Sequence, residues 1–121
     1  MAFIRDFEIA STGMVVSNAY HVINGVNVEK RIVPFENAGS NWDHDPLKGS
    51  TGYAASIFIS VYSSKQARDD MKKPIGMIND AMPEKPVKLR FIFDASSSDS
   101  SLVQAYNYLK TTEYYSSATE D

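Results

Sequence analysis

Several residue types and sequence patterns are scarce or missing in this chain. Its 121 residues include no cysteine, two histidines and one tryptophan. The lack of cysteine excludes disulfides and thiolate metal ligands, and suits a protein made in a reducing cytoplasm. No apolar run approaches the roughly 20 residues of a membrane-spanning helix, and residues 1–6 do not resemble a signal peptide. The net charge of −3 leaves no basic excess for phosphates. We therefore expect neither a membrane nor a nucleic-acid partner.

Catalytic motifs are also missing. The sequence has no P-loop, no Gly-x-Gly-x-x-Gly after a strand and no Gly-x-Ser-x-Gly elbow. His44 stands between Asp43 and Asp45, but zinc sites draw their ligands from separated positions, so we interpret this as a polar loop. His21 fits a residue on a sheet face better than a base, and Asp6 with Glu8 fits a solvated pair. We expect no enzymatic activity, no cofactor and no metal site.

What the sequence does contain is β-strand patterning. Asn24-Gly25 separates two β-rich runs and predicts a type I′ hairpin, because that turn needs positive φ at both central residues. Residues 53–62 alternate and predict a central strand, with Ile57 and Ile59 in the core and Ser60 on the more polar face. Shorter alternating runs at 3–9 and 87–93 predict two further strands.

Helices and loops complete the expected domain. Ser63 or Ser64 is placed to cap a short helix over 65–72, and Asp99 or Ser100 to cap a C-terminal helix. In that second helix, apolar residues at helical spacing are expected to face the sheet, namely Leu102, Tyr106 and Leu109. We predict one domain over 1–121, mainly β (α+β), built as an antiparallel β-sandwich or partly open barrel. A long loop at 35–52 and a frayed tail at 116–121 are expected.

The remaining notable residues suit contact with another molecule. Trp, Tyr and Met are enriched in protein interfaces, and here they gather in the polar loop, in the Pro- and Gly-rich segment 74–86 and near the C-terminus. The candidate partner-binding residues are Trp42, Met77, Met82, Tyr108, Tyr114 and Tyr115. The alternative interpretation is that these methionines and tyrosines close the open ends of the sheet.

Several short phrases of the chain form a familiar pattern, namely Gly52-Tyr53-Ala54-Ala55, Ser64 to Asp69 with Lys73-Pro74-Ile75, Ala105 to Thr111, Glu113-Tyr114 and Ala118-Thr119. Together these phrases resemble small virion or tail-associated structural proteins of tailed bacteriophages. The opening at 3–13 also fits, whereas residues 35–51 look like an insertion. The resemblance covers most of the chain. It implies a strand-rich body followed by a helix, and no catalytic residues.

The resemblance implies a non-enzymatic, multi-copy particle component found in the virion and assembled in the cytoplasm of the bacterial host. Its place would be the tail, baseplate, collar or capsid surface. Its partners would be other virion proteins, with homo-oligomers or a multi-copy ring expected. The main alternative is a ligand- or carbohydrate-binding β-domain that uses the Trp42 loop as its site.

Overall fold

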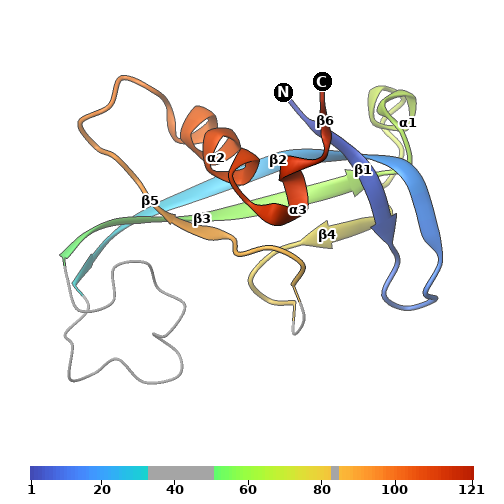
Figure 1. The fold of residues 1–121 in the computed structure, drawn as a ribbon, viewed down its shortest axis with the longest axis horizontal. Helices are drawn as coiled ribbons and strands as arrows, with labels where there is room; N and C mark the ends of the chain where they lie inside the picture. The colour runs from blue at the N-terminus through green and yellow to red at the C-terminus, as the bar shows by residue number, and fades with distance from the viewer. Residues whose placement is uncertain (33–50, 83–84) are drawn as a thin grey trace.

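The computed structural model describes residues 1–32, 51–82 and 85–121 (Figure 1). The described residues form mainly antiparallel β-sheet with a few short helices, which confirms the prediction of a mainly-β fold. The choice between a sandwich and a partly open barrel stays a prediction. The elements in chain order are β1 (Phe3–Glu8), β2 (Val15–Ile32), β3 (Thr51–Tyr62), α1 (Lys65–Asp69), β4 (Gly76–Ile78), β5 (Arg90–Ile92), α2 (Ser101–Lys110), α3 (Glu113–Ser116) and β6 (Thr119–Glu120).

All six described strands belong to one antiparallel sheet, in the order β4-β3-β2-β1-β6. β5 also pairs with β3, beside β4 on the same edge. β2 pairs with β1 through its first part and with β3 through the rest. The two long strands, β2 and β3, cross the whole molecule (Figure 1). The predicted central position of β3 is confirmed.

The core lies on the face of the sheet where α2 and α3 are placed. The predicted core residues Ile57 and Ile59 are buried there, as are Ala55 and Val61 on the same predicted face. Tyr53, which was predicted to share this face, is 39% exposed. Both helix caps fall on predicted residues: the Ser64 Oγ accepts from the Ala67 N–H at 3.0 Å, and the Ser100 Oγ accepts from the Val103 N–H at 3.2 Å. In α2, Tyr106 and Leu109 are buried as expected. Leu102, however, is 43% exposed, because it lies in the first turn of the helix.

The predicted hairpin turn at Asn24-Gly25 is wrong. β2 runs through both residues, and neither has a positive φ. Ile23 pairs with Ile59 and Gly25 with Phe58, which leaves Asn24 as the extra residue of a β-bulge. The Asn24 side-chain amide donates to the Ser60 Oγ at 2.5 Å. β3 pairs with β2 before and after Asn24-Gly25, and this long pairing overrides the local preference of the two residues for a turn.

Ser60, which accepts the hydrogen bond from the bulged Asn24, is buried. It was expected on a polar face, yet only 4% of it is exposed. The face that carries Ser60 has a smaller apolar cluster of its own, formed by Ala2, Tyr20 and Val22 with Ile4 and Tyr62 packed against them. The sheet is therefore partly covered on both faces rather than half-buried throughout.

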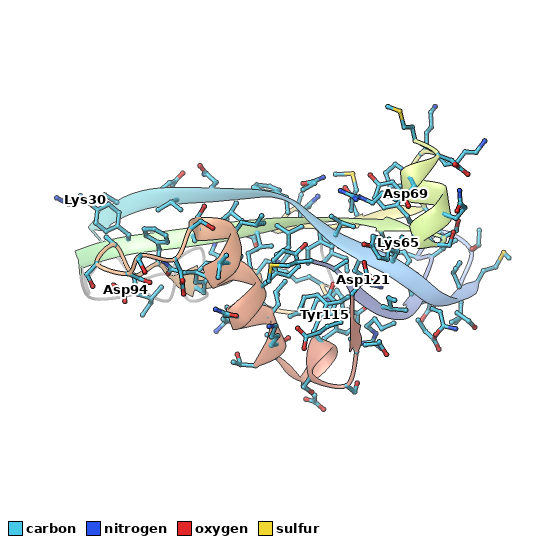
Figure 2. The ribbon with its side chains drawn as sticks, turned by 90° about the horizontal axis from the view of Figure 1, so that it is seen from above. Lys30, Lys65, Asp69, Asp94, Tyr115 and Asp121 are labelled. Carbon is cyan, nitrogen blue, oxygen red and sulfur yellow. The ribbon has the colours of Figure 1, made fainter. Side chains whose placement is uncertain are left out.

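The expected fraying at 116–121 is also wrong. β6 pairs with β1, and the Asp121 N–H donates to the Ala2 carbonyl at 3.0 Å. The Tyr20 hydroxyl donates to the Asp121 carboxylate at 2.7 Å, and Lys65 lies 3.4 Å from it (Figure 2). The residues of this tail have polar side chains, but their backbone groups pair with the edge of β1, which would otherwise be open.

His21 lies on β2 with 1% of its surface exposed, so its expected place on a sheet face is confirmed. One ring nitrogen, Nε2, lies 3.2 Å from the Arg5 carbonyl, and Nδ1 lies 3.1 Å from the Tyr115 hydroxyl. A carbonyl can only accept, so Nε2 donates and Nδ1 accepts from Tyr115. Burial lowers the pKa of His21 to about 4, against a smaller opposing effect of the Arg5 carbonyl.

Two glycines provide a matched test of the sheet packing. A Cβ at Gly76 would lie 2.6 Å from Cε2 of the buried Phe7 ring, whereas one at Gly25 would lie 3.7 Å from the Phe58 Cδ2. Gly76→Ala should destabilise the fold by about 1–3 kcal/mol through overpacking. Gly25→Ala should stay within about 1 kcal/mol of wild type. Urea melts of the two variants check this; a costly Gly25→Ala would restore the tight-turn interpretation.

The His21 pKa gives a pH prediction. The folded chain keeps His21 neutral, so the unfolded chain binds the extra proton between pH 6.5 and about 4. Stability should therefore fall as the pH is lowered through this window, by about 3 kcal/mol in total. His21→Gln, which is neutral at every pH, should remove most of that slope in denaturant melts at several pH values. A slope that survives in His21→Gln would assign the effect to other groups.

The tail provides a third test of the fold. Tyr115 fills the core and β6 closes the β1 edge, so removing residues 113–121 should unfold the chain or lower its melting temperature strongly. Removing residues 119–121 alone should cost less, because Tyr115 stays in place. Circular dichroism melts of both truncations measure this. A stable chain without 113–121 would show that the core does not need Tyr115.

Candidate functional site

The structure separates the residues that were predicted to contact partners. Tyr115 is 2% exposed and stacks on Phe3 with ring centroids 4.6 Å apart, so the expectation that its ring is left for a neighbour is wrong (Figure 2). The spacing of α3 after α2 turns this ring into the core. Trp42 and His44, with most of the 35–52 loop, lie outside the described residues.

The Tyr108 side chain makes its contacts with residues of its own subunit. Its ring stacks on Phe91 at 5.2 Å, and its hydroxyl donates to the Lys88 carbonyl at 2.9 Å. Beyond the end of β5, the Gln104 amide accepts from the Asp94 N–H and donates to the Asp94 carbonyl. A groove of about 540 Å³ lies between β5 and α2. Side chains from α2 therefore close both ends of this strand edge, as expected where a sheet edge is protected from pairing.

Met77 lies on an exposed stretch of the sheet, opposite Ser60. Phe58 and Ile92 on the adjoining strands are exposed on the same face. Met77 is therefore accessible, as expected of a contact residue, but it does not line the groove between β5 and α2.

Met82 and Tyr114 come together in one pocket of about 530 Å³. β1, the start of β2, the segment after β4 and α3 all contribute to it. Its lining residues are Arg5, Asp6, Phe7, Glu8, Ala10, Val15, Met82, Pro86 and Tyr114. We call it the Met82 pocket. It unites two of the six predicted contact residues, which lie far apart in the sequence.

Arg5 fixes one wall of the Met82 pocket. Its guanidinium lies 3.7 Å from the centre of the Tyr114 ring and donates to the Tyr114 carbonyl at 2.7 Å. The same side chain donates to the Asp6 carbonyl. A cation over an aromatic face is attracted by the ring quadrupole, and Arg suits this role. Burial raises the pKa of Tyr114, so the phenol is protonated at neutral pH.

A bulge between β1 and β2 shapes the rim. The pairing shifts between Arg5 and Phe7, opposite Asn18, which has a φ of 54°. Asn tolerates this left-handed conformation better than most residues, and its N–H donates to the Asp6 carboxylate at 3.0 Å. Asp6 and Glu8 are exposed at the rim, which agrees with their interpretation as a solvated pair. Val15 beside them is 60% exposed.

Sequence reasoning missed Arg5, Phe7 and Val15 as parts of a site. The alternation of residues 3–9 identified a strand, but only the bulge brings these three side chains to one hollow. No sequence signal marks Met82 as their neighbour, because the segment after β4 follows no regular pattern. The sequence therefore predicted the strand that carries Arg5 and Phe7, but it did not predict that their side chains line one pocket with Val15.

The chemistry of the Met82 pocket is that of binding. Its walls are aromatic and aliphatic, its rim carries two carboxylates, and its one guanidinium is engaged by Tyr114 and Asp6. His21 is not placed to act as a base there, since it is buried with both ring nitrogens bonded. Within residues 1–32, 51–82 and 85–121, no group of three His, Cys, Asp or Glu side chains is placed to hold a metal ion. In the same ranges, no helix is long and apolar enough to cross a membrane.

Comparisons with known proteins return no match. No family model fits the chain, no curated protein resembles it significantly, and no solved structure does so.

Proposed function

We propose that this chain is a non-enzymatic structural subunit of a tailed-phage particle that acts by protein–protein assembly through the Met82 pocket. The observation that carries the proposal is the convergence of Met82 and Tyr114 in one hollow, with the exposed Val15 at its mouth. The phrases that resemble virion proteins supply the phage context. The place in the particle is the tail, baseplate, collar or a decoration on the capsid.

The composition of the pocket supports a protein partner. Tyr, Met and Arg are the residue types most enriched in interface cores, and the pocket combines one of each with Phe7 and Pro86. Covering an exposed aliphatic side chain such as Val15 with a partner favours binding, because each Å² of apolar surface removed from water contributes about 25 cal/mol of free energy. Binding here needs no catalytic group and no cofactor.

The pocket is also largely preformed, which lowers the entropy lost on binding. Arg5 holds the Tyr114 ring from one side, and Phe7 rests against the bare backbone of Gly76. Phe7 also meets the His21 ring edge-on, with centroids 5.8 Å apart. A partner side chain would therefore enter a hollow whose walls are already fixed. The alternative ligand- or carbohydrate-binding role at Trp42 stays a prediction.

A charge placed at the pocket mouth tests this function. Val15→Lys puts a long cation at an exposed position opposite Glu8, where the fold should tolerate it. Ser98→Lys, on the exposed loop before α2, is the matched control. In phage whose genome encodes this chain, we expect wild type and Ser98→Lys to be present in purified particles in many copies, and Val15→Lys to be depleted. Quantitative mass spectrometry of the particles measures this.

Two results would overturn the proposal. If the wild-type chain is absent from purified particles, it is not a virion component. If Val15→Lys is incorporated as well as Ser98→Lys, the Met82 pocket is not the contact. Melting curves of the isolated variants confirm that both remain folded.

A further inference from the structure

Met71 has an unusual backbone and an unusual exposure. It follows α1 with a φ of 59°. The Met71 N–H donates to the Arg68 carbonyl and the Lys72 N–H to the Ala67 carbonyl, the pattern of a Schellman helix end. Glycine normally occupies this left-handed position, because a side chain there costs free energy. Met71 is nevertheless a large apolar residue and is 91% exposed, so neither backbone preference nor burial accounts for it.

The residues that follow Met71 are cationic. Lys72 and Lys73 are both exposed, and neither makes an ion pair or side-chain hydrogen bond with the described residues. By contrast, Lys65 of the same segment pairs with Asp121. We call Met71–Lys73 the knob: one apolar side chain on a strained backbone beside two lysines that have no partner in the part of the chain that the structure describes. Strain at an exposed residue points to a function outside the fold.

The Met82 pocket has the complementary character. Its interior is apolar, from Phe7, Met82 and Pro86, while Asp6 and Glu8 place two carboxylates at the rim. The remaining charge in its lining, Arg5, is turned to Tyr114 and to the Asp6 carbonyl. An apolar side chain flanked by lysines therefore matches both the hollow and its rim.

We propose that the Met82 pocket of one subunit binds the knob of a second copy of this chain. The inference rests on the proposed function of the pocket as a protein contact and names the partner. Met71 would enter between Phe7 and Met82, with Lys72 and Lys73 facing the carboxylates of the rim. In Figure 1, α1 lies at the top of one end of the molecule, whereas the segment after β4 lies below the sheet. One subunit thus presents its knob and its pocket to two different neighbours.

A contact of this kind is heterologous, because two different surfaces meet. Repeating it adds subunits head to tail, which gives a ring if the rotation closes and a filament if it does not. The attraction between lysines and rim carboxylates is exposed to solvent, so it should weaken as salt screens it. Wild-type protein should therefore show a mass that rises with concentration and falls with added salt.

Met71→Gly separates this role from the fold. Glycine suits the left-handed position, so the melting temperature should rise by about 2–6 °C. Loss of the side chain should weaken self-association by about tenfold or more, as for a central interface residue. Lys72→Glu with Lys73→Glu should weaken it as well. Lys88→Glu, which reverses an exposed lysine elsewhere, is the matched control and should associate like wild type. Sedimentation velocity over a concentration series measures all four proteins.

A mixing experiment tests the head-to-tail geometry. Met71→Gly keeps the pocket and lacks the knob, whereas Glu8→Lys keeps the knob and has a disrupted rim. At a concentration where each variant alone is monomeric, the mixture should form dimers and nothing larger, because each pair has a single working contact. Larger species in the mixture would overturn the head-to-tail arrangement. Wild-type protein that is monomeric at every concentration, or Met71→Gly that associates like wild type, would overturn the inference itself.

The outcomes also separate this inference from the proposed function. If Val15→Lys is lost from particles while the wild-type chain never self-associates, the pocket contacts another virion protein and the second-copy inference falls alone. If pocket variants change neither particle incorporation nor self-association, both proposals fall.

Discussion

The pairing of β2 with β3 is the constraint on which the rest of this structure depends. The two strands are paired in register from Tyr20 with Tyr62 to Ile32 with Thr51, interrupted only by the bulge at Asn24. β1 is built on the first part of β2, and β4 and β5 share the far edge of β3. α2 packs on both long strands. A slip of one residue in this ladder would exchange the core face for the opposite face along the whole sheet.

Core and pocket are coupled through two adjacent tyrosines. Tyr115 points inward and donates to His21, while Tyr114 points to the Met82 pocket and stacks under Arg5. Arg5 belongs to both networks, because its carbonyl accepts from His21 and its guanidinium holds Tyr114. Arg5 therefore links the wall of the pocket to the buried core behind it.

The features that were predictable from the sequence depend on neighbouring residues. The alternation of residues 53–62 and the capping serines Ser64 and Ser100 were predicted because strand faces and helix ends are decided within a few positions. Asn24-Gly25 misled because the turn preference is also local, and the distant β3 offered more hydrogen bonds than the turn did. The tail was misjudged for the same reason: its polar residues say nothing of the open edge on β1. The Met82 pocket combines residues from four parts of the chain, and only the folded sheet brings them together.

The closure of β1 by β6 affects how the chain folds during synthesis. β1 is made long before its partner on the outer edge, because among the described residues that edge is paired by Thr119 and Glu120, and the Tyr115 ring that covers Phe3 comes from the same late segment. A nascent chain on the ribosome therefore carries an open strand edge and an incomplete core until these residues emerge. Open edges of this kind attract other strands, so the chain is most prone to aggregate in the interval before β6 is available to pair. Completion of the sheet therefore waits for the segment that carries Tyr115 and β6, and it is slowed because the contacts join distant parts of the sequence.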